Sequence, residues 1–490
     1  MVVIAAEQRW KIAIFMLAFL FILAHRLPFL TQPLVGEEGS HAMLLKGYSN
    51  KITENVDDFY HTGDFRKDCL LVIARVESTY YVTGPSRTIV PYCFVEKVIG
   101  PAFRFIEPWA KTFDHKSAIA RLAYLMVCGI GMLSLLYVSY QTAKTDTFTI
   151  VLINILVVVY FLTTPIAVGG SIQPQLDGSI GVAIMGLMLI LLFKANSSKD
   201  SKYRLFLSCI AGVLACCCKN EWPLALLATI FVTYLLKKIN NIFYKKDISL
   251  LSEYQIRFRE IAIGLTLGLI IGVFTCWALA PQDYIDGFQL MRAIRGEHFS
   301  VVKLVSIQFP LIYPLGLAII GAVLVHGFNR RTPTNVVESI LLFFAGALSS
   351  GFLASGWVGD YFPRYFIPPI VLLTGCIVLA LPSIMKKAHV AIQVASITIL
   401  LSGVLFNTYT LAKRAVHNVS ITSQPGLHNP LTKKIIQDAS SQVLIGSIRR
   451  THSSVAYYTD DTDFVSNALS PDVVTKLLSK TGHSDLKVAE

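Results

Sequence analysis

The sequence is poor in charge and lacks the short motifs of nucleotide and zinc chemistry. Asp, Glu, Lys and Arg make up 15% of its 490 residues, whereas soluble domains carry about 25%. No GxxxxGK[ST] or GxGxxG phosphate-binding loop occurs. The nine cysteines form no CxxC pairs with zinc-like spacing. The low charge excludes a disordered chain, a coiled coil, a collagen-like rod and an ordinary cytosolic enzyme.

Hydrophobic residues make up 54% of the chain, and the mean hydropathy is +0.58. A helix needs about 20 apolar residues to cross a bilayer, and we expect about eleven such spans in an all-helical polytopic membrane protein. The first run follows Lys11 and ends near Ala24. Because no small-residue cleavage site follows it, we expect an uncleaved span. The other runs begin near Ala118, Phe148, Asp177, Leu205, Pro223, Ile261, Leu304, Val336, Tyr365 and Ala388.

The net charge of +12 comes from 43 Lys and Arg against 31 Asp and Glu. The basic residues are dispersed in short loops between apolar runs, a pattern that sets membrane orientation and does not predict a nucleic-acid partner. With a cytoplasmic N-terminus, the cytoplasmic segments hold Arg9, Lys11, Lys144, Lys194, Lys199, Lys202, Arg204, Lys237, Lys238, Lys245, Lys246, Arg257, Arg259, Arg330, Arg331, Lys386 and Lys387. The short segments on the other side hold far fewer.

This orientation places two long segments outside the cytoplasm. We expect residues 1–410 to form the transmembrane domain, with a first extracytoplasmic loop at 27–117 that contains amphipathic helices lying in the membrane interface. Residues 411–490 are expected to form a small extracytoplasmic α/β domain. A strand is predicted at 442–448, and a second strand is predicted to begin at Tyr457 and Tyr458. Cys69 and Cys93 fall in the first loop and could pair in an oxidising compartment.

Ionisable residues gather at the outer ends of the predicted spans. Five outer segments carry them: Gly36-Glu37-Glu38-Gly39; Gln173 to Asp177; Lys219-Asn220-Glu221; the loop from Asp283 to His298; and Trp357 to Tyr365, with Arg364. Ionisable groups at a membrane boundary are costly to desolvate and therefore indicate a functional site.

Each of these residues also has a simpler structural interpretation. Glu37 and Glu38 could simply lie at a helix N-terminus, where acidic residues are favourable, and Asp177 could be a helix N-cap. Lys219 and Arg364 could be basic residues at span ends whose charged groups extend to the membrane surface. The combination of acids and cations on one side nevertheless favours transfer from a lipid phosphate. A carboxylate can deprotonate an acceptor, while Lys and Arg can stabilise the phosphate charge.

The order of these motifs resembles the GT-C superfamily of membrane glycosyltransferases, and within it the branch of protein O-mannosyltransferases and lipid A aminoarabinose transferases. That branch has an acidic pair, usually Asp-Glu, soon after the first span, which matches Glu37 and Glu38. A second acid before a mid-chain span matches Asp177, and a Lys-containing turn between two close spans matches Lys219. The sequence Arg364-Tyr365-Phe366-Ile367-Pro368 matches an Arg-Tyr pair that opens a late span.

The resemblance implies a helical membrane bundle that transfers a hexosyl or pentosyl group from a polyprenyl-phosphate donor. It implies that Glu37 is the catalytic carboxylate, although Glu replaces the family's Asp, so Glu38 remains an alternative. Asp177 is the third catalytic candidate. Lys219, Arg364 and Tyr365 correspond to donor-phosphate residues, and Arg87 is a looser match. No cofactor is implied, and only Asp283 and Asp286 hint at a divalent cation.

Other functions stay open at this stage. The alternatives are a transporter or flippase of a lipid-linked substrate, a glycan ligase, a different lipid-phosphate transferase and a non-catalytic assembly partner. A transporter is disfavoured because internal repeats are not evident and the charges lie at span ends. The acceptor can be protein, lipid or glycan. Because no retention signal is present, a bacterial inner membrane, with the active site extracytoplasmic, is the expected location in the cell envelope.

Overall fold

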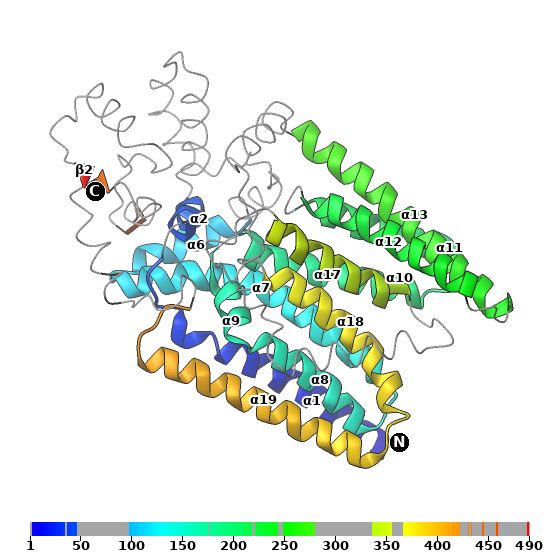
Figure 1. The fold of residues 1–490 in the computed structure, drawn as a ribbon. Coiled ribbons are helices and arrows are strands. Elements are labelled where there is room, and N and C mark those ends of the chain that lie inside the picture. Colours follow the sequence, from blue (N-terminus) through cyan, green and yellow to red (C-terminus); the bar gives the residue numbers. More distant parts are fainter. Residues whose placement is uncertain are drawn as a thin grey trace.

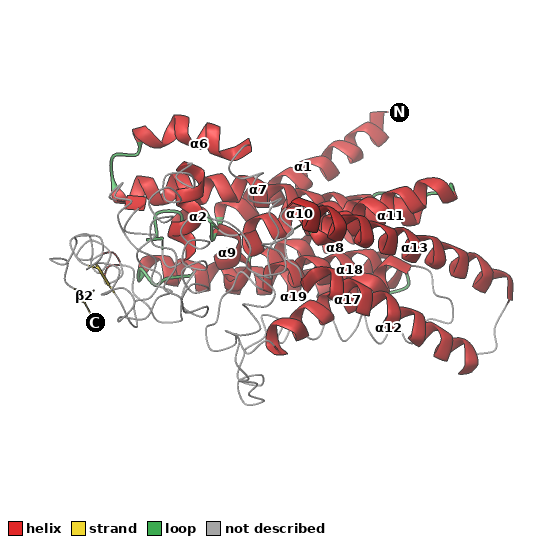
Figure 2. Ribbon diagram, turned by 90° about the horizontal axis from the view of Figure 1, so that it is seen from above, coloured by secondary structure: helices red, strands yellow, loops and turns green. Residues whose placement is uncertain are grey.

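The structure is a computed structural model of the chain, and almost all of its described part is helical (Figures 1 and 2). It describes residues 2–34, 37–46, 98–174, 176–217, 221–243, 248–279, 336–354 and 366–421, with 430, 433, 443–444, 457–458 and 488–489. The first half contains α1 (Val2–Ala24), η1 (Leu27–Phe29), α2 (Glu37–Lys46), α6 (Gly100–Ile106), η4 (Glu107–Trp109), α7 (Phe113–Ala143), α8 (Phe148–Leu162), α9 (Pro165–Ile172), η5 (Leu176–Ile180), α10 (Gly181–Ser197) and α11 (Ser201–Cys216). The second contains α12 (Glu221–Phe243), α13 (Ile248–Leu279), α17 (Val336–Ala354), α18 (Ile367–Met385), α19 (Val390–Val416), β1 (Val443–Leu444) and β2 (Val488–Ala489).

The protein is an integral multi-pass membrane protein. Six helices of the described chain are long and apolar enough to cross a membrane, and the bent pair α8 and α9 brings the number to seven if it counts as one span. Shorter apolar helices occur at Trp222–Leu235 and Val337–Leu348. The span expected near Leu304 lies outside the described residues. The helical, multi-span fold is therefore confirmed, whereas the total of eleven spans stays a prediction.

Helix α18 lies at the centre of the bundle, where it packs against α7, α8, α10 and α17. In its most apolar stretch 89% of the residues are buried, against 22% for α1 and 17% for α19. Helix α19 turns large apolar side chains such as Leu405 and Phe406 outward. An apolar outer surface is what lipid-facing helices require, since lipid tails are as apolar as leucine.

Helices α11 and α13 approach each other closely along a stripe of glycines. Gly264, Gly268 and Gly272 are spaced by four residues and therefore lie on one face of α13. A Cβ atom at Gly268 would overlap the backbone carbonyl of Cys209 in α11. Small residues allow such close backbone approach between membrane helices, and because Gly264 lies against Leu205 while Gly272 lies against Cys216, this pair forms a tight parallel unit beside α10 (Figure 1).

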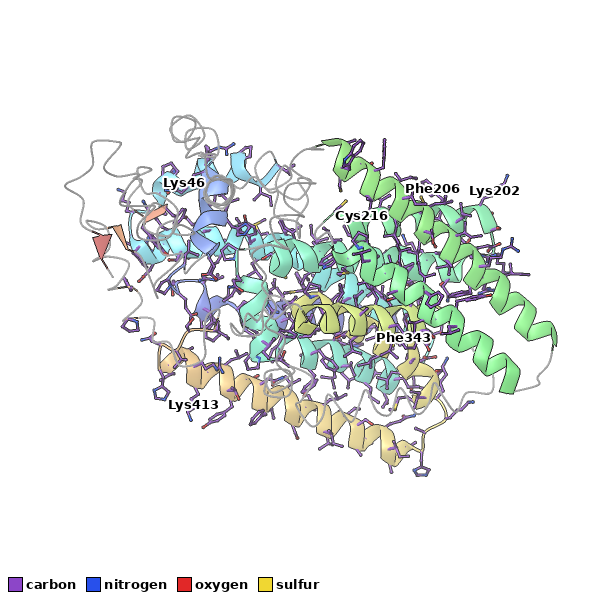
Figure 3. All side chains as sticks on the ribbon, turned by 45° about the horizontal axis from the view of Figure 1, so that its top comes forward. Lys46, Lys202, Phe206, Cys216, Phe343 and Lys413 are labelled. Atoms are coloured by element: carbon purple, nitrogen blue, oxygen red, sulfur yellow. The ribbon has the colours of Figure 1, made fainter. Side chains whose placement is uncertain are left out.

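One end of the bundle is held by lysines that the charge pattern assigns to the cytoplasmic side. Lys11 Nζ donates to the backbone carbonyls of Lys144 and Asp146, at 3.2 and 3.3 Å. Lys386 Nζ forms an ion pair of 2.6 Å with Asp146. These contacts join α1, the α7–α8 turn and the α18–α19 turn at what we call the Lys386 end. The opposite end, which carries α2, η5 and the first turns of α7, is called the α2 end. Figure 3 shows Lys46, at the end of α2, far from Lys202 of α11, another lysine that the charge pattern assigns to the cytoplasmic side.

The described parts of the C-terminal tail are short. Strand β1 lies within the predicted strand at 442–448, and it pairs in parallel with β2, with Val443 opposite Val488. The prediction of a second strand at Tyr457 and Tyr458 is wrong, because both residues are helical. Their side chains pack on α7 instead, so tertiary contacts override the strand preference of tyrosine. An α/β domain at 411–490 stays a prediction, and α19 continues to Val416.

Candidate active site

The predicted acid pair opens helix α2. The helix begins at Glu37, and Glu38 is completely buried. Both oxygens of the Glu38 carboxylate accept hydrogen bonds from Arg121 of α7, at 3.0 Å from Nη1 and 2.9 Å from Nη2. Arg121 is also completely buried. The two residues therefore form a bidentate ion pair inside the protein, a geometry that is among the strongest for a guanidinium and a carboxylate.

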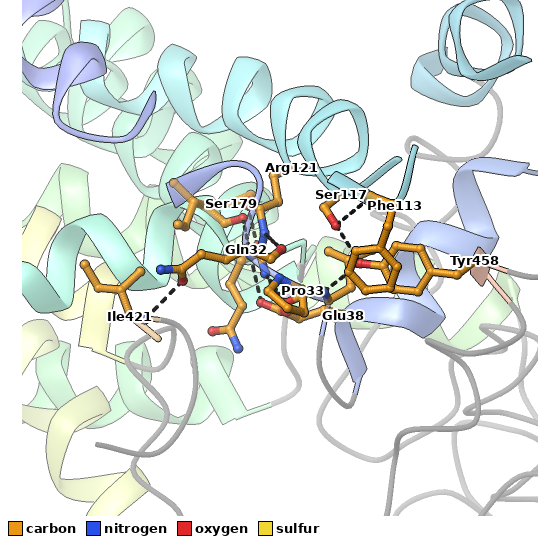
Figure 4. Close-up of polar contacts among 12 residues, drawn as sticks. Gln32, Pro33, Glu38, Phe113, Ser117, Arg121, Ser179, Ile421 and Tyr458 are labelled. Carbon is orange, nitrogen blue, oxygen red and sulfur yellow. Dashed lines mark hydrogen bonds and ion pairs between the residues drawn. The ribbon is translucent and has the colours of Figure 1, made fainter. Parts of the chain in front are cut away.

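Every N–H group of Arg121 has an acceptor. Besides the Glu38 carboxylate, three backbone carbonyls accept from its guanidinium: Gln32 at 3.2 Å, Pro33 at 2.9 Å and Ile172 at 3.2 Å. An arginine has five N–H donors, and all five are used here. Full hydrogen bonding is what makes a buried charge tolerable, so Arg121 holds the chain before α2 and the end of α9 in one arrangement (Figure 4).

Gln32 extends this network to the chain that follows α19. Its side-chain amide donates to the carbonyl of Val419 at 3.1 Å, and its oxygen accepts from the backbone N–H of Ile421 at 3.2 Å. The first predicted outer loop and the C-terminal tail therefore meet at the α2 end. This is the side on which the charge pattern places both segments, although the orientation itself stays a prediction.

A bend in the third apolar segment brings the end of α9 to Arg121. Helices α8 and α9 meet at an angle of 66°, where Thr164 caps α9 and Pro165 occupies its first turn. The proline lacks an N–H and cannot continue the α8 hydrogen-bond ladder. The guanidinium of Arg26 braces the bend by donating to the Leu162 carbonyl at 3.0 Å and to the Ser171 hydroxyl at 2.8 Å.

Asp177 lies in the π-helical turn η5, which begins four residues after the end of α9. Ser179 secures this turn by donating to the carbonyl of Gln173 at 2.9 Å. The turn packs against α7, α9 and α10. The segments that carry Glu38 and Asp177 are thus brought together beside Arg121, which is bonded to Ile172 just before the turn.

The far end of α2 is held by α6 and η4. Arg104 donates to the carbonyl of Leu45 at 3.1 Å, and Lys46 forms an ion pair of 3.2 Å with Glu107. Trp109 follows in η4 and is 77% exposed. An exposed tryptophan beside short helices is typical of the membrane interface, and the interfacial position of the first outer loop stays a prediction.

The other predicted site residues lie outside the described chain. These are Arg87, Lys219, Arg364 and Tyr365, as well as the possible disulfide partners Cys69 and Cys93 and the acids Asp283 and Asp286. Helix α12 begins two residues after Lys219, and α18 begins three residues after Arg364. In the described residues there is no group of three or more His, Cys, Asp or Glu side chains that could hold a metal ion.

Arg121, the centre of the network, was not among the residues predicted from the sequence. Its signal was present: it is a charged residue a few positions inside an apolar run that begins near Ala118. Such residues in membrane spans almost always have a partner in the protein interior. The identity of the partner, 83 residues away in sequence, could not be read from local pattern.

Solved structures share this architecture over nearly the whole chain. The crystal structure of ArnT from Cupriavidus metallidurans in the apo state aligns with a TM-score of 0.54 and 15% identity, covering 99% of this chain and 90% of that one. The chain shares the fold of ArnT. ArnT from the same organism bound to undecaprenyl phosphate aligns with a TM-score of 0.51 and 13% identity, again over 99% and 90%.

A weaker match is the oligosaccharyltransferase of Archaeoglobus fulgidus, with a TM-score of 0.45, 12% identity and coverage of 88% of this chain and 57% of that one. No family model and no curated protein matches the sequence. ArnT is a GT-C superfamily membrane glycosyltransferase. The resemblance to the GT-C superfamily is therefore confirmed at the level of the fold.

Proposed function

We propose that this protein is a membrane glycosyltransferase that takes a sugar from a polyprenyl-phosphate donor. The observation that carries the proposal is the likeness to ArnT over 99% of the chain, including the form of ArnT bound to undecaprenyl phosphate. The fully hydrogen-bonded network beside the acid pair supports it, because a reaction on a lipid-linked sugar needs a rigid site at a membrane boundary. The acceptor is a hydroxyl or amine of a protein, lipid or glycan.

In the proposed reaction a carboxylate takes the proton of the acceptor group as the acceptor atom attacks the anomeric carbon of the sugar. The bond between that carbon and the phosphate oxygen breaks, and the electron pair leaves with the polyprenyl phosphate. The carboxylate we propose is Glu37. Glu38 is the weaker candidate because both of its carboxylate oxygens already accept hydrogen bonds from Arg121.

The remaining assignments follow the same proposal. Asp177 is a second acid of the site, because its turn lies beside Arg121. Lys219, Arg364, Tyr365 and Arg87 are proposed to hold the donor phosphate. The α2 end is extracytoplasmic and the Lys386 end cytoplasmic, in keeping with the distribution of basic residues. The chain then has about eleven spans and a small α/β domain at the extracytoplasmic side of the membrane.

The test is a transfer assay with the purified protein and a panel of polyprenyl-phosphate sugars. Replacing Glu37 by Gln should lower kcat by about 10²- to 10⁴-fold, the usual contribution of a general base. The matched control is Glu260→Gln, which removes a carboxylate that pairs with Arg204 at 2.5 Å, away from α2. Wild-type kcat in the Glu37 variant would overturn the assignment of the base.

The same preparation tests the main alternative. Interrupted helices such as α8 and α9 also occur in transporters, so a flippase of lipid-linked sugars is the second candidate. Proteoliposomes loaded with a fluorescent polyprenyl-phosphate sugar separate the two functions. Movement of the lipid across the bilayer with no sugar transferred to any acceptor would favour the flippase and refute the transferase.

A further inference from the structure

The C-terminal tail contacts the acid-pair site through Tyr458. The Tyr458 hydroxyl lies 2.6 Å from the Ser117 hydroxyl of α7, and it accepts from the backbone N–H of Leu34 at 2.9 Å. The Tyr458 ring stacks on Phe113, with ring centres 3.8 Å apart. One side chain of the tail thus touches both α7 and the chain that leads into α2 (Figure 4).

The direction of each hydrogen bond follows from the partners. Ser117 donates to the carbonyl of Phe113 at 3.1 Å, which uses its only proton. Tyr458 must therefore donate to the Ser117 oxygen, while it accepts from Leu34. The result is an ordered chain from the Leu34 N–H through two hydroxyls to the Phe113 carbonyl. Each hydroxyl both donates and accepts in this chain, so no other rotamer of the hydroxyl protons satisfies it.

Backbone contacts secure the tail at the same place. Lys116 Nζ donates to the carbonyl of Tyr458 and Lys46 Nζ to that of Tyr457, each at 2.9 Å. The Tyr457 hydroxyl donates to the carbonyl of Lys116 at 2.9 Å. Lys433, also in the tail, forms an ion pair of 2.8 Å with Asp114. Residues of the tail are thereby attached to the first turns of α7 and to the last residue of α2.

The contact with Leu34 is the one that reaches the acid pair. Leu34 directly follows Gln32 and Pro33, whose carbonyls accept from Arg121. Glu38, which is bonded to the same guanidinium, comes four residues later. The short segment before α2 is therefore held on one side by Arg121 and on the other by Tyr458. A shift of this segment moves the start of α2, where both acids lie.

We propose that Tyr458 is a positioning residue that couples the C-terminal tail to the acid pair through the backbone of Leu34. This inference rests on the proposed function, because the acids are catalytic only in a transferase. It makes the tail a part of the active site: with Tyr458 engaged, the segment before α2 is fixed, and without it the acids lose their defined position. On this proposal Tyr458 acts on the position of the acids and not on the binding of the donor lipid.

The experiment replaces Tyr458 by Phe, which keeps the ring on Phe113 and removes only the hydroxyl. Loss of this hydrogen-bonded link is expected to lower kcat about tenfold, the factor that corresponds to ~1.4 kcal/mol, with donor KM unchanged within about twofold. The matched control is Tyr457→Phe, which also removes one buried hydroxyl but leaves Leu34 untouched; its kcat should stay within about twofold of wild type. Melting temperature and elution in size-exclusion chromatography show whether both variants are folded.

A second measurement needs no activity. Hydrogen exchange of the peptide that covers 30–46 should be faster by about tenfold at the Leu34 amide in the Tyr458 variant, and unchanged in the Tyr457 variant. Equal kcat in wild type and Tyr458→Phe would overturn the inference, as would an equal loss in both variants. If the wild-type protein transfers no sugar from any donor, the proposed function fails, and with it the catalytic part of the inference. Exchange then still decides whether Tyr458 fixes Leu34, and unchanged protection refutes that contact.

Discussion

Removing one member of the Arg121–Glu38 pair should destabilise the protein strongly. Both side chains are completely buried, and breaking a buried ion pair from one side leaves an uncompensated charge, at a cost of about 3–5 kcal/mol. Replacing Arg121 by Gln also leaves at least three of its five acceptors without a donor, because an amide has two N–H groups. Glu38→Gln leaves the arginine charge buried without its counter-ion.

The expected change in melting temperature follows from the size of the chain. The entropy of unfolding is about 2.1 cal/mol/K per residue, which for 490 residues gives about 1 kcal/mol per degree. Each single variant should therefore melt about 3–5 °C below wild type. The double variant removes both charges at once, so it should lose no more than the worse single variant, and the two effects should be far from additive.

Thiol labelling is a suitable assay because the spans contain buried cysteines. Cys128, Cys216, Cys276 and Cys376 are buried, so a thiol-reactive dye reports their exposure as the detergent-solubilised protein is heated. The control is Lys433→Ala, which breaks an ion pair whose two side chains are 35% and 50% exposed; exposed pairs contribute about 0–1 kcal/mol. Strictly additive losses, or a wild-type melting temperature in the Arg121 variant, would refute the reasoning.

Two further predictions concern the α11–α13 pair and the Tyr458 hydroxyl. Gly268→Leu should prevent close packing of α13 on the backbone of Cys209. It should lower the melting temperature by several degrees, because overpacking typically costs about 1–3 kcal/mol or more. The control is Gly346→Leu, whose side chain enters open space and should leave the melting temperature unchanged; equal effects of the two variants would contradict the close packing of α11 and α13. Burial raises the pKa of the Tyr458 phenol above its usual value near 10, so its stabilising contribution is fully present below pH 10 and is lost only as the pH rises beyond that value. Protection of the Leu34 amide, corrected for intrinsic exchange, should therefore be constant between about pH 6 and pH 9, and a loss of protection within that range would count against the hydroxyl link.

The sequence pattern predicted the parts of the fold that depend on local composition. Long apolar runs marked the helices, since a span needs a continuous apolar stretch. The basic residues in short loops grouped Lys11, Lys144 and Lys386, and the structure joins these three segments at one end. Glu37 was expected to open a segment soon after the first span, and it opens α2.

The parts that depend on tertiary packing were not predicted. The bend at Thr164 and Pro165 was not singled out, because a proline in an apolar run is compatible with either a span or a break. Arg121 and Glu38 are 83 residues apart, and Tyr458 and Ser117 are 341 apart. Periodicity describes which face of a helix is apolar, but it carries no information on which distant residue meets a buried charge.

The Arg121–Glu38 pair is better explained by geometry than by stability. A buried ion pair can often be replaced by apolar side chains of similar volume with no loss of stability, so the pair is not needed merely to fill the space between α2 and α7. What an apolar contact cannot do is bind three carbonyls from two separate segments, as Arg121 does with Gln32, Pro33 and Ile172. Because these bonds are directional, they fix the start of α2 relative to the turn that carries Asp177. The arrangement therefore stabilises one relative position of the two acidic segments, which is the requirement that a transfer reaction between two bound substrates imposes.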